Sequence, residues 1–197
     1  LNFRDVLNAL DLYPGDPGLL GCECVGRVVA VGNQVNGSRA HSLQIGDEVM
    51  AIAPGSFSQF ITIDANLVVH RPRSLSLEES ATIPVTFLTA YYTLYHLGGL
   101  KAEDRRQKAE EGTATNLKSK IQNSKSKTVL VHAASGGVGQ AAIQLAHLAG
   151  AEVFATASPA KWEQVRQLGV ARVANSRSLE FADEVMDWTE GQGVDLV

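Results

Sequence analysis

Apolar and polar positions alternate over short distances in the first part of this chain. Up to about Pro84, short apolar runs are separated by clusters of glycine, proline, asparagine and aspartate, which is typical of β-strands joined by turns. The runs cover residues 24–31, 48–53, 57–63 and 67–70. This spacing predicts a small, partly open β-barrel, preceded within residues 1–10 by a strand end and a short helix.

A helical pattern begins after Leu75. Ser76 is followed three residues later by Glu79, which is the spacing of a capping box at the start of a helical turn. Residues 85–97 then form a long apolar run rich in threonine and tyrosine, and two glycines end it. The change of pattern predicts a first domain at residues 1–84 and a second at residues 85–197.

Residues 101–127 differ from both domains in composition. The segment is rich in lysine, glutamate, serine and asparagine, and Leu117 and Ile121 are its only large apolar residues. It lacks the apolar surface whose burial offsets the entropy cost of ordering. We expect an exposed polar insertion at about 101–127, whose cations belong to a solvated loop rather than to a docking surface.

Residues 128–157 contain a strand, a glycine-rich turn, a helix and a second strand. Residues 128–132 alternate β-branched and apolar side chains, as in a buried parallel strand. Residues 140–148 carry apolar side chains at helical spacing, Gly150 ends this helix, and residues 152–156 begin the next strand. The order of these elements predicts a βαβ unit.

The turn of this unit carries small residues where a dinucleotide would bind. Ala133, Gly136 and Gly139 take the small positions of a G-x-G-x-x-G fingerprint, with alanine in the first. The first supports a tight turn, the second admits a pyrophosphate, and the third lets helix and strand pack closely. The helix N-terminus directs N–H groups and partial positive charge at the phosphates. The expected diphosphate-binding residues are Ser135, Gly136, Gly137, Val138 and Gly139. A glycine-rich turn without a ligand is the alternative.

The residues after the second strand distinguish the two nicotinamide cofactors. An NAD site needs a carboxylate about 20 residues past the glycines to accept from the ribose 2′-hydroxyl. Here Ala157, Ser158 and Pro159 are followed by Lys161, with no Asp or Glu. A hydroxyl and an ammonium group suit a 2′-phosphate, and Arg177 adds a second cation, so we predict NADPH. Alternatively, Lys161 and Arg177 are solvated surface cations.

Composition and charge exclude some classes of partner. The apolar fraction of 45% and charged fraction of 19% are ordinary for a globular cytoplasmic protein, and the net charge of −4 gives no attraction to nucleic acid or an anionic membrane. No signal-peptide pattern and no run of about 18 apolar residues is present. Cys22 and Cys24 are one residue apart in a strand-like run, so we expect no disulfide between them.

Both ends of the chain read as truncated. It begins at Leu1 without a methionine, and residues 193–197 read as the start of another parallel strand. A doubly wound nucleotide fold has about six strands, of which the pattern accounts for three. We therefore expect an α/β fragment, with a partial barrel followed by a partial doubly wound parallel sheet.

Several motifs resemble one enzyme family. They are GCECVG at residues 21–26 with Gly32, GDEV at 46–49, NFRDV at 2–6, YPG at 13–15, the run at 81–92, VHAASGGVGQAAIQLA at 131–146 and ASPAKW at 157–162. In this order they resemble the medium-chain dehydrogenase/reductase superfamily. Within it, the chain is most similar to the enoyl reductase domains of polyketide and fatty acid synthases, and is close to quinone oxidoreductases. The resemblance implies a GroES-like barrel ahead of a Rossmann domain.

The resemblance also implies a reaction. NADPH would deliver hydride to C3 of a 2-enoyl thioester, and C2 would then be protonated. The substrate would arrive on the phosphopantetheine arm of an acyl carrier protein, among neighbouring synthase domains in the cytoplasm, with no nucleic-acid or membrane partner. Three alternatives remain: an NADPH:quinone oxidoreductase, a hydride-triggered variant such as a cyclopropane-forming reductase, and a noncatalytic nucleotide-binding member.

Site residues carry over only where positions match. Asn2 and Tyr13 match positions that face the nicotinamide and substrate in the family, and Tyr13 is the candidate acid, unless it is a loop tyrosine packed on the barrel. Thr89 matches a threonine near the nicotinamide, unless its hydroxyl bonds back within its helix. Zinc-dependent relatives have a histidine where Cys22 stands, together with four closely spaced cysteines, so we expect no metal.

Overall fold

The computed structural model describes residues 1–33, 43–100 and 126–197. The chain forms two compact units, an N-terminal unit (Leu1–Leu88) and a C-terminal unit (Thr89–Val197). The predicted boundary between residues 84 and 85 falls at the start of α3 (Pro84–Tyr91), the helix that runs from one unit into the next. The polar insertion predicted at about 101–127 lies outside the described residues, except for 126 and 127.

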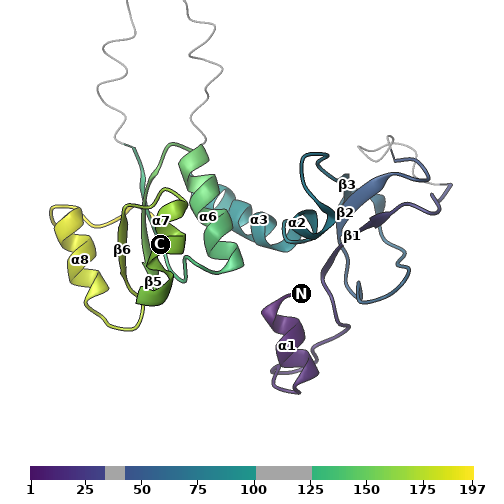
Figure 1. Cartoon of the computed structure of the whole chain (residues 1–197), viewed down its shortest axis with the longest axis horizontal. Coiled ribbons are helices and arrows are strands. Elements are labelled where there is room, and N and C mark those ends of the chain that lie inside the picture. The colour runs from purple at the N-terminus through teal and green to yellow at the C-terminus, as the bar shows by residue number, and fades with distance from the viewer. Residues whose placement is uncertain (34–42, 101–125) are drawn as a thin grey trace, which may run out of the picture. The chain divides into compact units, whose positions relative to one another are not determined.

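The N-terminal unit contains an antiparallel sheet in the order β1 (Glu23–Arg27), β2 (Glu48–Ile52), β3 (Val68–His70) (Figure 1). In β2, the side chains of Val49 and Ala51 are buried and alternate with less buried neighbours, because successive side chains of a strand point to opposite faces. These strands confirm three of the four predicted apolar runs, although β1 ends at Arg27 and not at residue 31.

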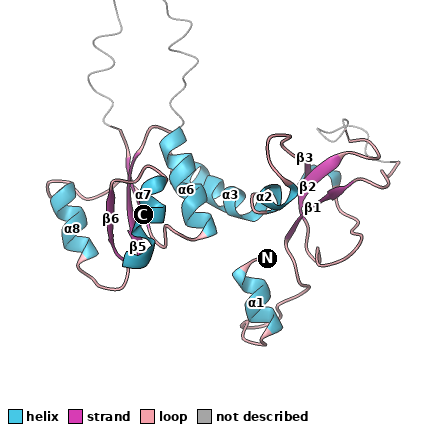
Figure 2. Ribbon diagram, viewed as in Figure 1, coloured by secondary structure: helices cyan, strands magenta, loops and turns pink. Residues whose placement is uncertain are grey.

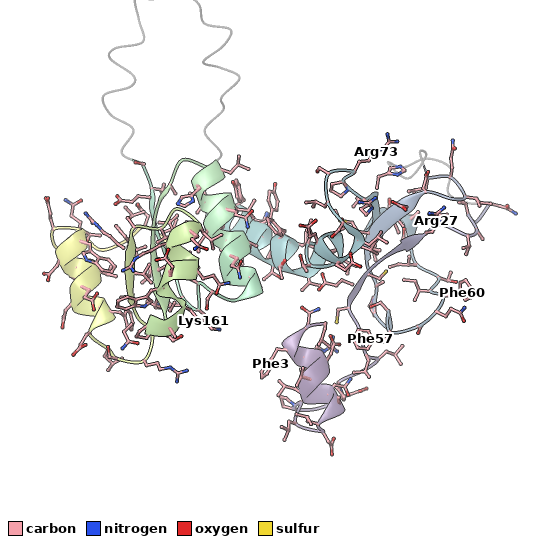
Figure 3. The ribbon with its side chains drawn as sticks, in the orientation of Figure 1. Phe3, Arg27, Phe57, Phe60, Arg73 and Lys161 are labelled. Carbon is pink, nitrogen blue, oxygen red and sulfur yellow. The ribbon has the colours of Figure 1, made fainter. Side chains whose placement is uncertain are left out.

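The fourth predicted strand, at residues 57–63, is wrong. The segment is a loop that pairs with none of the described strands, as the ribbon in Figure 2 shows. The Ser58 hydroxyl bonds back to the Gly55 carbonyl at 2.8 Å, which closes a turn where the strand was expected to start. Phe57 and Phe60 are more than half exposed (Figure 3). The apolar residue types alone therefore misled the prediction, because none of the side chains of residues 57–63 is buried.

Short helices complete the N-terminal unit. They are α1 (Phe3–Ala9), the 3-10 turn η2 (Ala65–Leu67) and α2 (Leu77–Ala81). The capping box is confirmed: the Ser76 N–H donates to Glu79 Oε2 at 2.8 Å, and the Glu79 N–H donates to Ser76 Oγ at 3.1 Å. The two bonds satisfy donors that have no acceptor within the helix, so the box fixes where α2 begins.

The long helix predicted at residues 85–97 changes its winding part-way. Helix α3 is followed by a π-helical segment, η3 (Tyr92–Leu97), which ends at Gly98. The Tyr95 hydroxyl donates to the Leu145 carbonyl at 3.0 Å. This bond attaches η3 to the helix that follows the glycine turn, α6 (Gly137–Leu148).

The C-terminal unit contains a parallel sheet in the order β4 (Thr128–Val131), β5 (Glu152–Ala157), β6 (Arg172–Asn175). Val129 forms a parallel bridge with Leu196, and the Leu130 N–H donates to the Leu196 carbonyl at 2.9 Å. The last residues of the chain therefore lie on the free side of β4. This single bridge agrees with the beginning of a parallel strand predicted at residues 193–197, although no full strand forms there, and it gives the strand order of a doubly wound fold.

Helices pack against the strands of this sheet (Figure 1). Helix α6 contacts β4 and β5, α7 (Trp162–Gln167) contacts β5 and β6, and α8 (Phe181–Trp188) contacts β6. Leu130 and Phe154 are register partners and form a buried cluster with Val185 of α8. Burial of such side chains contributes about 2 kcal/mol each. Within the described parts of the chain, no helix has the length and hydropathy needed to cross a membrane.

Candidate functional site

The glycine-rich turn lies at the carboxyl end of β4. Ala133 has a φ of 49°, in the left-handed region, and its carbonyl accepts a hydrogen bond from the Gly136 N–H at 2.8 Å. A Cβ added at Gly139 would lie 2.6 Å from the Ala133 oxygen and 2.7 Å from the Ala134 Cα. Only glycine fits at this position, because helix α6 passes directly over the backbone of the turn.

The first small position of the fingerprint needs a correction. Counting back from Gly139, the G-x-G-x-x-G spacing falls on Ala134 and not on Ala133. The two alanines divide the role: Ala133 provides the left-handed turn, whereas Ala134 is fully buried and packs beneath Gly139. The spacing in the sequence already assigns the position to Ala134, so the prediction of Ala133 was one residue too early.

The amino end of α6 is arranged to bind an anion. Gly136 is the cap, and the Gln140 N–H donates to its carbonyl at 2.9 Å, so Gly137, Val138 and Gly139 precede the first bonded N–H of the helix. Helix geometry leaves such N–H groups without an intrahelical acceptor, and the helix dipole adds positive potential. The Gln140 side chain donates to the Ser135 carbonyl at 2.9 Å and holds the turn in place.

The three residues proposed for a 2′-phosphate follow neighbouring strands. Ala157, the last residue of β5, is the register partner of Asn175, the last residue of β6. Ser158 and Lys161 follow β5, and Arg177 follows β6, so all three lie at the carboxyl edge of the sheet (Lys161 is labelled in Figure 3). Lys161 and Arg177 are exposed, and no carboxylate of the described residues lies within salt-bridge distance of either.

Thr89 lies on α3 and its side chain is exposed. The Thr86 hydroxyl bonds back to the Thr82 carbonyl, just before α3, at 2.6 Å, and the Thr93 hydroxyl of η3 bonds back to the Thr89 carbonyl at 3.0 Å. Among residues 1–33, 43–100 and 126–197, the Thr89 hydroxyl forms no hydrogen bond. The back-bonding expected as its alternative role is therefore absent there, and the hydroxyl is open to a ligand.

Asn2 is the N-cap of α1 in the N-terminal unit. Its N–H donates to Asp5 Oδ2 at 2.7 Å, and the Gly21 N–H donates to Asp5 Oδ1 at 2.8 Å. Asp5 is only 3% exposed. Burial raises the pKa of this carboxyl, but the two backbone donors, together with the positive charges of the N-terminus and Arg4, hold the pKa below its ordinary value.

The side chain of Asn2 is held by Glu23. Its Nδ2 donates to Glu23 Oε1 at 2.9 Å, while the Val85 N–H donates to Glu23 Oε2 at 2.8 Å. Glu23 thus supplies the acceptor that the start of α3 lacks, next to Pro84, which has no N–H. No sequence pattern indicates this contact, because the partners are 21 and 62 residues away.

Tyr13 lies on a loop that the polar face of α1 holds. The Arg4 guanidinium carbon lies 5.3 Å from the centre of the Tyr13 ring. Arg4 also donates to the Pro17 carbonyl and to Cys22 Sγ, the latter at 3.4 Å, and Asn8 Nδ2 donates to the Gly18 carbonyl at 3.0 Å. The ring of Tyr13 is thus stacked under Arg4. Residues 4, 5 and 8 of α1 lie on one face of the helix. This polar face is the sequence signal that could have indicated that α1 holds the loop.

Comparison with known proteins places the chain in a family. Residues 137–197 match a family model described as zinc-binding dehydrogenase. The whole chain is 40% identical to 8% of a phenolphthiocerol/phthiocerol polyketide synthase of Mycobacterium tuberculosis, and 99% of it is 42% identical to 3% of the polyketide synthase GfsB of Streptomyces halstedii.

Solved structures extend the match to the fold. The CurK enoyl reductase is 42% identical with a TM-score of 0.79, and the CurF ER cyclopropanase is 38% identical with a TM-score of 0.76; each match covers all of this chain and 55% of the other. Mycobacterial Rv1454c, solved with NADPH, is 28% identical over 98% of this chain and 53% of its own, with a TM-score of 0.70. The chain belongs to the medium-chain dehydrogenase/reductase superfamily.

This medium-chain dehydrogenase/reductase chain spans about half the length of the solved structures it matches and a tenth or less of the curated relatives. The likeness covers both units and confirms the predicted fold class, a GroES-like part followed by a Rossmann part. The chain is therefore similar to a small part of each polyketide synthase and to about half of a solved enoyl reductase.

The residues around Cys22 do not fit a zinc ion. The Arg4 guanidinium donates to Cys22 Sγ, and Glu23 already accepts two hydrogen bonds. Burial, and then the charge of Glu23, raise the pKa of the Cys24 thiol above its ordinary value, which disfavours the thiolate a metal needs. Both cysteines are free thiols, and no three metal-binding side chains come together among the described residues.

The residues at the carboxyl edge of the parallel sheet do fit a nicotinamide dinucleotide. The N-terminus of α6 offers N–H groups beside Gly136, where a Cβ would contact only the Ala133 oxygen, at 3.2 Å. A diphosphate can therefore approach the backbone closely.

Proposed function

We propose that this chain is part of an NADPH-dependent enoyl reductase domain of a polyketide synthase. The reaction adds a hydride to C3 and a proton to C2 of a 2-enoyl thioester and so saturates the double bond. The observation that carries the proposal is the carboxyl edge of the parallel sheet. It combines the free N–H groups at the start of α6 with Lys161 and Arg177, neither of which forms a salt bridge with a carboxylate of the described residues. The match to the CurK enoyl reductase supports this choice of reaction.

The cofactor has a defined set of residues to bind it. The N–H groups of Gly137, Val138 and Gly139 bind the diphosphate beside Ser135 and Gly136. Ser158, Lys161 and Arg177 bind the 2′-phosphate, because a hydroxyl and two cations complement a dianion. The Thr89 hydroxyl is available to the nicotinamide.

The bound cofactor supplies the hydride, and the protein manages charge and protons. Negative charge develops on the thioester oxygen and is stabilised by hydrogen-bond donors. Tyr13 is the candidate in this chain for the donor of the C2 proton. Arg4 keeps the Tyr13 ring in place, and Asp5 with Glu23 keeps Asn2 in place. Asn2 lines the substrate side in this proposal.

The substrate is expected to reach the site on the phosphopantetheine arm of an acyl carrier protein in the cytoplasm, next to other synthase domains. The polyketide synthases of which this chain matches a small share support that setting.

The reaction can be tested with the complete domain, crotonyl-pantetheine and NADPH. Loss of absorbance at 340 nm with formation of the butyryl product supports the proposal. Turnover of quinones alone would instead identify an NADPH:quinone oxidoreductase. No turnover with either substrate, despite cofactor binding, would identify a noncatalytic member.

The cofactor preference can be tested by replacing Lys161 with alanine. We expect NADPH to bind about tenfold more weakly, and NADH unchanged, because only NADPH carries the phosphate that Lys161 contacts. Lys127→Ala is the matched control: it removes a lysine just before β4, at the amino edge of the same sheet. Equal losses for both cofactors, or none for either, would contradict the assignment.

A second candidate reaction is hydride-triggered ring closure, because the CurF ER cyclopropanase matches this chain almost as well as CurK does. Both reactions begin with hydride addition and differ in the fate of the electrons that reach C2. An enoyl substrate with a leaving group at C4 separates them: ring closure releases that group, whereas reduction retains it and adds a proton at C2.

A further inference from the structure

One carbonyl oxygen joins the two loops that carry the proposed 2′-phosphate residues. Ala157 is the buried last residue of β5. Its oxygen accepts a hydrogen bond from the indole N–H of Trp162 at 3.0 Å and another from the Ser176 N–H at 3.1 Å. The first donor follows the turn after β5, and the second lies in the loop after β6.

The turn after β5 is closed twice. The Lys161 N–H donates to the Ser158 carbonyl at 2.8 Å, which forms η4 (Pro159–Lys161). The next residue, Trp162, reaches back over this turn to the residue that precedes it. The hydrogen bond of its indole therefore joins the two ends of the turn that contains Ser158 and Lys161.

The loop after β6 is held to the same oxygen. Ser176, which donates to Ala157, is followed by Arg177, whose N–H donates to Asn175 Oδ1 at 3.0 Å. Trp162 is half-buried, and the Arg166 guanidinium carbon lies 5.5 Å from the centre of its ring. The indole thus has support on one face and a fixed acceptor at its N–H.

We propose that Trp162 is a positioning residue that sets the preference for the 2′-phosphorylated cofactor. It touches no reacting atom, but it fixes the turn that presents Ser158 and Lys161 to the phosphate. The inference rests on the proposed NADPH function. Loss of the indole hydrogen bond weakens binding of the 2′-phosphate. It leaves the diphosphate-binding N–H groups at the start of α6 unchanged.

The test is the ratio of the two cofactor affinities in Trp162→Phe. This change keeps an aromatic ring for Arg166 and removes the N–H. We expect the Kd for NADPH, measured by equilibrium titration of the full-length protein, to rise about fivefold, the effect of losing one neutral hydrogen bond. The Kd for NADH is expected to change less than twofold. Trp162→His, which keeps a ring N–H, is expected to lie between phenylalanine and the wild type.

Trp188→Phe is the matched control, because Trp188 is the other tryptophan of the chain. Trp188 is the last residue of α8, and its ring packs on Phe154 with centroids 5.7 Å apart. This variant is expected to lower the Tm and leave the NADPH-to-NADH ratio unchanged. The comparison separates loss of stability from loss of positioning.

Each outcome decides one claim. If the wild type binds NADPH no more tightly than NADH, the proposed cofactor preference fails. If the wild type prefers NADPH but Trp162→Phe retains the full preference, the role of Trp162 fails alone. A parallel loss of both affinities would reduce Trp162 to a structural residue and would also overturn the inference. If Trp162→Phe does not fold, Trp162→His decides: an unchanged ratio in that variant overturns the role.

Discussion

The turn after β4 is held mainly by backbone contacts, with one side-chain bond from Gln140, whereas the Tyr13 loop is held by side chains. In the turn, the Gly136 N–H bonds to the Ala133 carbonyl and Gly139 lies against bare backbone. In the loop, Arg4, Asp5 and Asn8 of α1 reach across to backbone groups of residues 17–21. The first arrangement depends on the absence of a Cβ, and the second depends on charged and polar side chains. The two regions should therefore fail under different perturbations.

The largest expected effect is that of Gly139→Ala. The new Cβ would overlap backbone atoms of Ala133 and Ala134, which cannot move aside as a side chain would. We expect a loss of about 3 kcal/mol in the free energy of unfolding of the C-terminal unit, together with loss of NADPH binding. Urea unfolding followed by circular dichroism, and cofactor titration, measure the two effects.

Gly136→Ala is the matched control for this variant. Its Cβ would contact only the Ala133 oxygen, at 3.2 Å, so folding is expected to survive nearly intact. NADPH binding is still expected to weaken, because the methyl group occupies the side from which the diphosphate approaches. Equal destabilisation by both variants would show that the turn is less tightly fixed than its backbone contacts indicate.

An intermediate effect is expected in the N-terminal unit when acid removes the charge of Asp5. The folded-state pKa of this carboxyl lies below its unfolded value, so the native state binds fewer protons there. Its contribution to stability is present above the unfolded pKa and is lost as pH falls through the folded pKa. Asp5→Asn is expected to cost about 2 kcal/mol at neutral pH and to flatten the acid side of the stability profile.

Asp11→Asn tests whether this acid dependence belongs to Asp5. Asp11 is exposed and has a φ of 56°, a conformation that asparagine adopts readily. Denaturant midpoints measured from neutral to acidic pH should show wild-type dependence in Asp11→Asn and a weaker dependence in Asp5→Asn. If Asp11→Asn weakens the pH dependence of the midpoint and Asp5→Asn does not, Asp5 does not hold the loop.

The same contrast explains what the sequence could predict. The capping box at Ser76 and the βαβ unit were predicted correctly because each is encoded by residues close together in the chain. The glycine turn at the start of α6 belongs to this group, since the helix follows its turn directly. Local pattern and local structure coincide in these segments.

Contacts between distant residues were not predictable in this way. Nothing in the pattern pairs Glu23 with Val85 or Arg4 with Tyr13, because side-chain clamps have no fixed spacing. The wrong strand at residues 57–63 has the related cause that burial depends on the neighbouring elements and not on the segment itself. Trp162 is a different case: its acceptor is only five residues away, but the motif drew attention to Lys161 instead.

The smallest effect, and the only stabilising one, is expected from Ala133→Gly. Alanine in the left-handed region costs about 1 kcal/mol, whereas glycine adopts it freely but loses more backbone entropy on folding. The net gain in the free energy of unfolding is expected to be about 0.5 kcal/mol. Its neighbour provides the contrast: Ala134 is fully buried beneath Gly139, so Ala134→Gly removes packing and is expected to destabilise by about 1 kcal/mol. Opposite signs for two adjacent alanines, measured as shifts of the urea midpoint, would confirm that the turn is specified by backbone conformation. A loss of stability in both variants would show that the Ala133 side chain also contributes contacts.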